Sequence, residues 1–339
     1  MDKLPITSIN LVAYNEERRI KKCLEFVFAQ TYQNTEVLVF DNNSSDKTVG
    51  IVEKEFADHI KSGKLKIYRS KENIGFGPGQ NRAATLTKGK YILGLCADVW
   101  LKEDFIQEAV KTMENDAQIG ALQAKIFRTI NGQKSDILDT TGFEIYKSRR
   151  IVNRGHGIKD IGQYDKSEEI FSYEGACPFW SRAAFQDCAI FGQTHDESYF
   201  WYGDDIDLGW RMHLLGWKNH YAPSVIAWHE RHTTHRLSNS KFDFIRLRKE
   251  LPKKKRMLDF VNVHLTLVKN DLGLFTWPDI YLFLKREILL VGYFLVFEPY
   301  TILIGIPRIT KSLPSAIRKR RQIMQRKKVS KEEIKKWYL

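Results

Sequence analysis

Apolar runs of strand length alternate with helical patterns along the first hundred residues. The expected strands are Ile6–Ala13, Thr35–Phe40, Lys64–Tyr68 and Tyr91–Cys96, and the expected helices between them are Glu17–Ala29, Asp46–Ile60 and Gln80–Thr87. Because right-handed crossovers through helices return the chain to a sheet in the parallel sense, this alternation predicts a Rossmann-like, mainly parallel central α/β sheet flanked by helices. The second half is less regular, with strands expected over Gly175–Trp180 and Asn219–Trp228.

Polar residues follow three of these strands. Residues 13–16 follow the first, residues 41–46 follow the second, and Asp98 follows the fourth. Ligands of open α/β sheets bind outside the carboxyl ends of the strands, and an acid there can hold a divalent cation and, through it, phosphate oxygens. Asp98 is therefore a candidate metal ligand or else a surface residue that ends a strand. Asp41 is either an acceptor for a nucleotide base or the cap of the next helix.

The glycines of residues 75–79 carry a weaker signal, because they form neither a G-x-G-x-x-G motif nor a P-loop. They are expected to make a turn, and Arg82 behind them is free to meet a phosphate.

A second group of acids precedes an expected helix. Ile206, Trp210 and Leu214 fall on one helical face, and Gly216 stops the helix. Asp204 and Asp205 at its start either cap it and favour its macrodipole, or supply a general base. The aromatic run 199–202 before them favours the second interpretation, since it would partly desolvate one carboxylate.

Three histidines lie just past the expected strand Asn219–Trp228. His229 ends it, and His232 and His235 follow closely. A lone histidine is usually structural, but three beyond a strand end make one of them a candidate metal or phosphate contact.

Composition describes an ordinary folded protein, with 339 residues, 43% hydrophobic and 28% charged. The four cysteines form no CxxC pair, so reduced intracellular thiols are expected, and the N-terminal residues do not read as a signal peptide. The net charge of +13 is concentrated in residues 308–339, where twelve Lys/Arg face two Glu. Such a tail attracts polyanions, either anionic lipid or nucleic acid.

An apolar segment precedes the basic residues. Ile288–Ile306 has nineteen residues, with Glu298 and Pro299 in its middle. A single helix of that length falls just short of a bilayer core, so two interfacial segments or a re-entrant hairpin compete with a span. The alternative is a buried pair of helices. Basic clusters beside an apolar anchor favour the cytoplasmic leaflet, and no companion motif supports nucleic-acid binding.

Four segments resemble, in order, the signatures of family 2 glycosyltransferases with the GT-A fold. They are residues 8–17 (with Tyr-Asn-Glu), 30–46 (Gln-Thr-Tyr to Asp-Asn-Asn-Ser-Ser-Asp), 72–82 (Asn-Ile-Gly-Phe to Asn-Arg) and 202–217 (Gly-Asp-Asp-Ile-Asp-Leu to Gly-Trp). The resemblance covers roughly residues 5–235 and is nearest to the rhamnosyltransferase-like branch that builds bacterial surface polysaccharides.

The resemblance implies roles for particular residues. Asp98 would hold Mg²⁺ or Mn²⁺ on a donor diphosphate with His229 as a further ligand, and Asp205, beside Asp204, would be the catalytic base. The sequence departs from the family pattern in having Cys96-Ala97-Asp98 instead of Asp-x-Asp, and Asp204-Asp205 instead of Glu-Asp. The implied donor-binding residues are Ala13, Tyr14, Asn15, Glu16, Asp41, Asn43, Asn73, Gly75, Arg82, Ala97 and Asp98.

The expected organisation is a GT-A domain over residues 1–240, with a donor half at about 1–100 and an acceptor half at about 101–240. A helical membrane-associating extension over 241–307 and a basic tail over 308–339 follow.

The expected function is inverting transfer of a sugar, with rhamnose as one candidate, from a nucleotide-diphosphate sugar to a hydroxyl of a lipid-linked glycan in cell-surface polysaccharide synthesis. One metal site, one base and no nucleophile with an attendant base fit a single displacement. The expected location is the cytoplasmic face of the plasma membrane, on an anionic lipid surface, without nucleic acid. One rival is a non-catalytic nucleotide-sugar-binding scaffold, and a second is a basic-tailed nucleic-acid protein.

Overall fold

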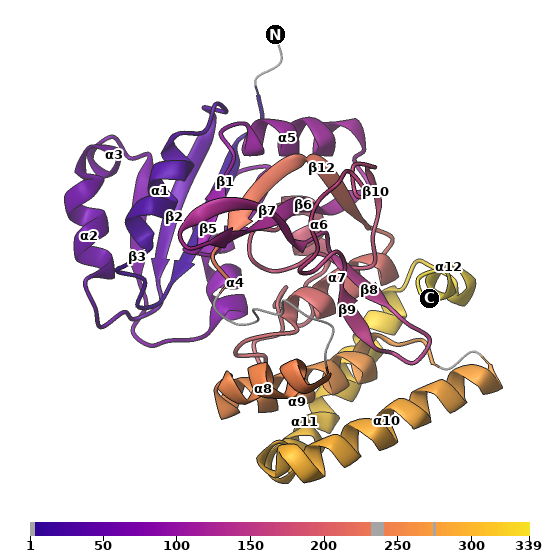
Figure 1. Cartoon of the computed structure of the whole chain (residues 1–339). Helices are drawn as coiled ribbons and strands as arrows, with labels where there is room; N and C mark the ends of the chain where they lie inside the picture. The colour runs from indigo at the N-terminus through magenta and orange to yellow at the C-terminus, as the bar shows by residue number, and fades with distance from the viewer. Residues whose placement is uncertain (1–3, 232–240, 274–275) are drawn as a thin grey trace.

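The structure, a computed structural model, describes residues 4–231, 241–273 and 276–339 (Figure 1). The strands are β1 (Thr7–Ala13), β2 (Thr35–Asp41), β3 (Leu65–Arg69), β4 (Tyr91–Leu95), β5 (Val99–Leu101), β6 (Ile119–Ile130), β7 (Gln133–Thr140), β8 (Phe143–Ile145), β9 (Ile151–Asn153), β10 (Glu168–Glu169), β11 (Phe179–Ser181) and β12 (Lys218–His229). The helices are α1 (Ile20–Phe28), α2 (Thr48–Glu55), α3 (Ala57–Lys61), α4 (Phe76–Leu86), α5 (Phe105–Asn115), α6 (Arg182–Asp187), α7 (Asp204–Leu214), α8 (Lys241–Glu250), α9 (Lys253–Asn270), α10 (Trp277–Phe297), α11 (Pro299–Arg326) and α12 (Lys331–Lys335).

One mixed sheet runs through the molecule, and its strand order is β10-β12-β6-β11-β4-β1-β2-β3. In the first half β1 pairs in parallel with β2 and β4, and β2 pairs in parallel with β3. The short strand β11 is antiparallel to both β4 and β6, so it joins the two halves into one sheet. The α/β class with helices flanking the sheet is confirmed, and the antiparallel strand β11 makes the sheet more mixed than the sequence pattern indicates.

The first half has the strand pattern of a sheet covered on both faces. All seven residues of β1 are buried. The apolar stripe of α1, which includes Cys23 and Val27, packs against one face. On the other face Val12 and Phe40 cluster with Ala83 of α4. Gly79 permits this close approach, because a Cβ there would lie 2.9 Å from Cγ1 of Val12.

Several element boundaries differ from those expected. The helix expected over 46–60 is broken at Phe56 into α2 and α3. Asp46 was expected as the first residue of this helix, but it precedes α2, and its Oδ1 accepts a hydrogen bond from the Thr48 N–H at 2.9 Å. Helix α4 begins at Phe76 instead of residue 80, because Gly75 adopts φ +94 and turns the chain directly into the helix. The strand expected over 175–180 is reduced to β11.

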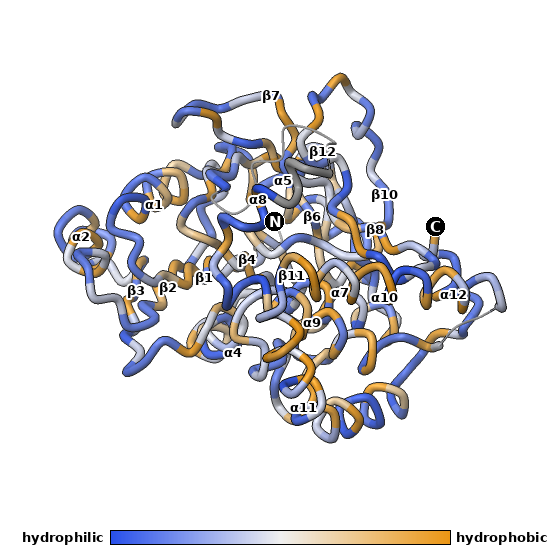
Figure 2. The backbone as a smooth tube through the Cα atoms, turned by 60° about the horizontal axis from the view of Figure 1, so that its bottom comes forward, coloured by the Kyte–Doolittle hydropathy of each residue, from blue (hydrophilic) through white to orange (hydrophobic). Residues whose placement is uncertain are grey.

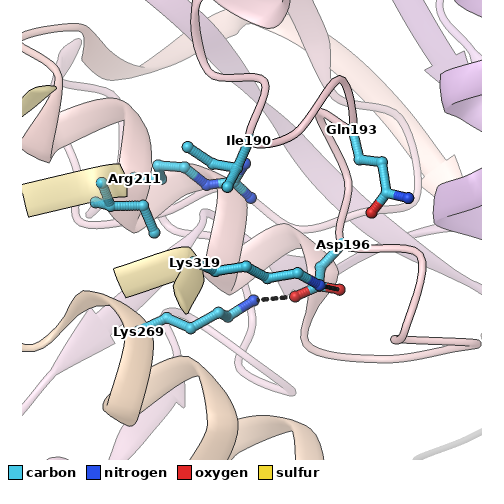
Figure 3. A pocket seen from close by; sticks show the side chains of 7 residues that line it. Ile190, Gln193, Asp196, Arg211, Lys269 and Lys319 are labelled. Atoms are coloured by element: carbon cyan, nitrogen blue, oxygen red, sulfur yellow. Dashed lines mark hydrogen bonds and ion pairs between the residues drawn. The ribbon is translucent and has the colours of Figure 1, made fainter. Parts of the chain in front are cut away.

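The C-terminal helices form a layer below the sheet (Figure 1). Ion pairs fasten α9 and α11 to the loop before α7. The Asp196 carboxylate pairs with Lys269 at 2.6 Å and also with Lys319 (Figure 3). Lys269 also pairs with Asp207, at 2.9 Å. The Arg320 guanidinium donates to the Asp271 carbonyl at 2.6 Å. Part of the positive charge expected in a basic tail is therefore used inside the fold.

The apolar segment 288–306 is divided between α10 and α11. Glu298 separates the two helices and is only 3% exposed, because its carboxylate pairs with Arg248 at 2.7 Å. Within the described ranges, no helix has the length and apolar character needed to cross a membrane. Figure 2 shows hydrophobic stretches along this helical layer. The large apolar side chains that α10 and α11 expose are Trp277, Tyr281, Leu282, Leu284, Ile288, Leu289, Leu295, Val296, Phe297, Tyr300, Leu303, Ile304, Ile306 and Ile317.

Candidate active site

The loops after β1 and β2 are tied together at the carboxyl edge of the sheet. Asn15 adopts φ +56, and its Oδ1 accepts a hydrogen bond from the Ser45 N–H at 2.8 Å. Asp41 is buried at the end of β2 and accepts from the Ser44 N–H at 3.1 Å, so it shapes its own loop and does not cap α2. Asn43 has φ +67, a conformation that asparagine tolerates better than most residues. Ala13 ends β1 beside Asp41 in the sheet register.

Asn42, which was not singled out from the sequence, links this edge to the turn before α4. It is 2% exposed, and its side-chain amide donates to Asn73 Oδ1 at 3.0 Å and to the Gly75 carbonyl at 3.1 Å. The Asn73 Oδ1 in turn accepts from the Gly75 N–H. Gly75 is required here, since a Cβ would lie 2.3 Å from the Phe200 carbonyl oxygen. Asn42 therefore holds Asn73 and Gly75, two of the expected donor-binding residues, at this edge of the sheet.

Two other expected donor-binding residues have few contacts. Tyr14 is 47% exposed. Arg82 is exposed on α4, and its guanidinium carbon lies 5.7 Å from the Tyr68 ring centroid. No contact among the described residues joins Arg82 to Asp98, so its expected phosphate contact stays a prediction.

Asp98 and His229 meet where β4 and β12 end. The Asp98 Oδ2 lies 3.3 Å from the His229 Nε2, and the Asp98 carbonyl accepts from the Glu230 N–H at 2.8 Å. Ala97 is buried beside them. The pKa of Glu16 is raised, chiefly by burial and to a smaller extent by the nearby charge of Asp98. His232 and His235 lie outside the described residues.

A buried carboxylate supports this pair from behind. Asp139 at the end of β7 is fully buried, and its Oδ2 lies 2.9 Å from the His229 Nδ1. Arg231 reaches Asp139 at 2.9 Å and Glu174 at 2.8 Å. Burial acts to lower the pKa of His229, but the carboxylates of Asp98 and Asp139 on its two ring nitrogens outweigh it and raise the pKa to about 10, so a cation beside Asp98 would have to displace the Nε2 proton. The sequence did not identify Asp139, because β7 contains several polar residues and no local pattern distinguishes this aspartate from the others.

The pair fits a divalent cation that a diphosphate also contacts. No cluster of three or more potential ligands occurs among the residues that the structure describes. A carboxylate and an imidazole are nevertheless suitable protein ligands, and Mg²⁺ usually takes one or two carboxylates and completes its shell with substrate phosphates and water. Asp98 and His229 can therefore hold a cation together with a substrate, and they do not form a closed cage.

A second acidic centre lies at the start of α7. Gly203 with φ +80 is the residue before the helix, so neither aspartate is its cap. Asp205 accepts hydrogen bonds from the Ile206 N–H at 2.8 Å and the Gly175 N–H at 3.1 Å. Asp204 lies 3.4 Å from the Nδ1 of His195, another residue that the sequence pattern did not mark. Asp205 itself forms no ion pair with a described residue.

Electrostatics separates the two acidic centres. Burial, then the neighbouring charges of Asp204 and Glu174, raise the pKa of Asp205 well above its usual value. Burial also raises the pKa of Asp204, to about 6. For Asp98, burial acts in the same direction, but the charge and hydrogen bond of His229 outweigh it and the pKa is lowered. Asp205 is thus the better proton acceptor of the two centres, and Asp98 is the better cation ligand.

Two cavities of the structure lie away from these centres. One, of about 10 Å³, has room for roughly one water molecule among Asp196, Arg211, Lys269 and Lys319 (Figure 3). Its walls are the ion pairs that hold α9 and α11. The other, of about 250 Å³, is lined by residues at the amino ends of β1–β3, the opposite edge of the sheet from Asp98. Neither cavity includes Asp98 or Asp205.

The arrangement is that of an α/β protein with polar side chains gathered at the carboxyl edge of its sheet, an aspartate–histidine pair at Asp98 and His229, and a separate group of buried carboxylates at Asp204 and Asp205. Residues 8–167 match the model of glycosyl transferase family 2.

Two curated relatives share the same region. The chain is 26% identical to the chondroitin synthase of Escherichia coli over 153 residues, which are 45% of this chain and 22% of that protein. It is 31% identical to an uncharacterized glycosyltransferase of Haemophilus influenzae over 122 residues, which are 36% of this chain and 37% of that protein. The chain therefore spans well under two thirds of these relatives.

A solved structure shares the fold over nearly the whole chain. The mannosyltransferase PcManGT of Pyrobaculum calidifontis, in complex with GDP-Man and Mn²⁺, superposes with a TM-score of 0.53 at 14% identity. The superposition covers 96% of this chain and 86% of that one. The GT-A fold is thereby confirmed.

Proposed function

We propose that the protein is an inverting glycosyltransferase, which moves a sugar from a nucleotide-diphosphate sugar to a hydroxyl of a lipid-linked glycan in the synthesis of a cell-surface polysaccharide. The observation that carries this proposal is the pair of acidic centres with opposite electrostatics. A carboxylate with an imidazole beside it suits a cation on a diphosphate. A buried carboxylate without a counter-ion among the described residues, and with a raised pKa, suits a base.

The chemistry assigns one task to each centre. Asp205 accepts the proton of the acceptor hydroxyl as its oxygen forms a bond to the anomeric carbon. The bond from that carbon to the phosphate oxygen breaks, and the nucleoside diphosphate leaves with the bonding electrons. Attack on the face opposite the leaving group inverts the anomeric centre. The Gly175 N–H, at 3.1 Å from Asp205 Oδ2, orients the carboxylate for this transfer.

Asp98 and His229 would hold the divalent cation, Mg²⁺ or Mn²⁺. When bound, such an ion neutralises charge on the departing diphosphate as a Lewis acid. Asp139 keeps the His229 ring in place through its Nδ1. The donor nucleotide would occupy the edge that Asp41, Asn43, Asn73 and Gly75 build. The Mn²⁺ and GDP-Man of the Pyrobaculum calidifontis structure support this class of ligand.

The apolar face of α10 and α11 supports a lipid-linked acceptor. Trp277, Ile288 and Val296 are 83%, 72% and 72% exposed, and they are three of the many large apolar side chains that these two helices expose. Exposed Arg308, Lys311 and Arg318 on α11 add positive charge. Apolar side chains with flanking cations suit an anionic bilayer surface, here the cytoplasmic face of the plasma membrane, on which the helices would lie without crossing it.

The test combines donor binding with turnover. Purified protein is screened against UDP-, GDP- and dTDP-sugars by thermal shift, with and without Mg²⁺ or Mn²⁺, and dTDP-rhamnose is included because of the sequence resemblance. A ligand at 100 times its Kd stabilises the fold by about 2.7 kcal/mol, which is readily observed. Release of nucleoside diphosphate is then followed with lipid-linked glycans as acceptors. Binding of a donor without any turnover, across all acceptors tried, would favour a non-catalytic scaffold instead.

A further inference from the structure

The first turn of α9 has a charge distribution opposite to the one that stabilises a helix. Lys253, Lys254, Lys255 and Arg256 begin this 18-residue helix, and no acid lies in its first turn. The partial positive charge of a helix N-terminus favours anions and disfavours cations. The first N–H groups also have no side-chain cap, since Pro252 precedes the helix. An anion bound here would meet both the cations and the unpaired N–H groups.

A buried lysine in the same turn also indicates that an anion binds there. Lys255 is 5% exposed, and it forms no ion pair or hydrogen bond with a residue that the structure describes. Its Nζ instead lies 4.1 Å from the ring centroid of Tyr202. Burial lowers the pKa of Lys255 to about 8, although the charge of Asp259, four residues further along the same helix, acts to raise it. Burying an ammonium without a partner is costly, so a ligand that supplies the missing negative charge is expected. The Nε of Arg256 is likewise buried without a hydrogen-bond acceptor among described residues.

Three contacts place this turn between the apolar face and the base. The Nζ of Lys253 lies 5.9 Å from the Tyr300 ring, which belongs to the exposed surface of α11. The Nζ of Lys254 lies 4.1 Å from the Phe200 ring, and Lys255 contacts Tyr202. Phe200 and Tyr202 lead directly into Asp204 and Asp205 at the start of α7. The charge of Glu174 acts on both Lys255 and Asp205, so the two side chains share one charged neighbour.

We propose that the first turn of α9 binds a phosphate or diphosphate group of the acceptor substrate, with the Lys255 ammonium as the central contact. This inference rests on the proposed glycosyl transfer and names the chemistry of its acceptor: a glycan whose lipid carrier is joined through phosphate. The carrier chain would lie along α10 and α11, its phosphate at Lys255, and its glycan hydroxyl at Asp205.

The test measures anion binding without metal, so that the donor position does not contribute. Geranyl diphosphate is titrated by calorimetry in EDTA into the full chain, and geraniol serves as the uncharged probe. Loss of one charge-assisted contact corresponds to a weakening of about tenfold or more. We expect that loss in Lys255→Met, recovery in Lys255→Arg, and wild-type binding in the charge-matched control Lys111→Met, whose side chain is exposed on α5.

Thermal unfolding separates a binding role from a structural one. Because Lys255 is a buried cation that forms no ion pair with a described residue, Lys255→Met should melt at or above the wild-type temperature. Equal binding of geranyl diphosphate by wild type and Lys255→Met, or equal binding of geraniol and geranyl diphosphate, would overturn the proposal. Binding to phosphatidylglycerol vesicles is measured as well. If Lys255→Met loses vesicle binding but still binds geranyl diphosphate, the ligand is a bulk lipid headgroup and the proposal is wrong.

The outcome is independent of the proposed function as a whole. Donor binding with Mn²⁺ and turnover test glycosyl transfer through Asp98 and Asp205. Diphosphate binding in EDTA tests only the α9 turn. If the protein transfers sugar, but Lys255→Met binds geranyl diphosphate as tightly as the wild type does, the proposed function stands and the phosphate site at α9 is wrong.

Discussion

Asp98 and Asp205 are both aspartates that follow an apolar stretch, but the structure surrounds them differently. Asp98 faces His229, which Asp139 holds from behind, and its pKa is lowered. Asp205 faces backbone N–H groups, with Asp204 and Glu174 as neighbouring charges, and its pKa is raised. One carboxylate is thus held ionised beside an imidazole, and the other has a raised affinity for a proton.

The difference shows why residue type alone does not assign a role. The partners of Asp98 come from β7 and β12, and those of Asp205 come from the Glu174–Gly175 loop. These partners are distant in sequence from the aspartate that they affect, whereas Asp204 and the Ile206 N–H are chain neighbours of Asp205. The chemistry of each centre is therefore a property of the tertiary fold, and variants can separate the two centres.

The largest effect is expected from Asp205→Asn. Loss of a general base lowers turnover by about 10²–10⁴-fold, whereas donor binding should be retained because the cation position is untouched. Steady-state kinetics and donor titration measure the two quantities. Asp204→Asn is the matched control, with a smaller loss expected; a greater loss in Asp204→Asn would move the base to that residue.

Asp98→Asn should act on the other centre. Removal of a metal's stabilisation of the leaving diphosphate costs several kcal/mol, which corresponds to a loss of about 10²–10³-fold in turnover. In contrast to Asp205→Asn, the metal-dependent part of donor binding should also disappear, and EDTA should have the same effect on the wild-type protein. Calorimetry of donor with and without Mn²⁺ measures this. Asp58→Asn, at a side chain that is 97% exposed, is the control and should change neither quantity.

Asp139→Asn should weaken the same centre indirectly. Removal of a carboxylate that orients a metal-binding histidine typically costs about 10–100-fold in metal affinity. Mn²⁺ titration followed by electron paramagnetic resonance gives the affinity directly, without turnover. Unchanged Mn²⁺ affinity in a folded variant would show that Asp139 only stabilises the β7–β12 region.

The smallest effect is expected in the pH profile. A base must be deprotonated, so turnover is present above the pKa of Asp205 and is lost as the pH falls through it. The charge of Asp204 raises that pKa, so Asp204→Asn should move the acidic limb of the kcat profile to lower pH. A limb that moves to higher pH, or does not move, would contradict the electrostatic coupling of the two aspartates.

The first half of the chain was well predicted from the sequence, because its strands are buried on both faces and its loops follow strand ends. Those patterns are local, and they placed Asp41, Asn43 and Asp98 at one edge. The second half was less accessible. Asp139 and Lys255 act through residues more than fifty positions away, and no local pattern marks either.

The C-terminal region shows a similar limit. Hydropathy identified residues 288–306 as apolar, but it could not predict which cation would pair with Glu298. The structure buries this carboxylate against Arg248, and breaking such a pair typically costs about 3–5 kcal/mol. Composition alone also counted Lys319 as part of a solvated tail, although it is an internal counter-ion of Asp196. The assignment of 308–339 as a separate basic tail stays a prediction.

The three-residue strand β11 determines how this chain can be recombined with its relatives. It contributes Phe179 and Trp180 to both β4 and β6, so the sheet has no seam at which a donor half ends and an acceptor half begins. A chimaera that exchanged residues 1–100 alone would have to pair a foreign β4 with this strand. The contact is close, because a Cβ added at Gly94 of β4 would lie only 2.5 Å from the Trp180 ring. A change of donor by segment exchange therefore has to carry β11 with it, and selectivity for donor and acceptor should be inherited together.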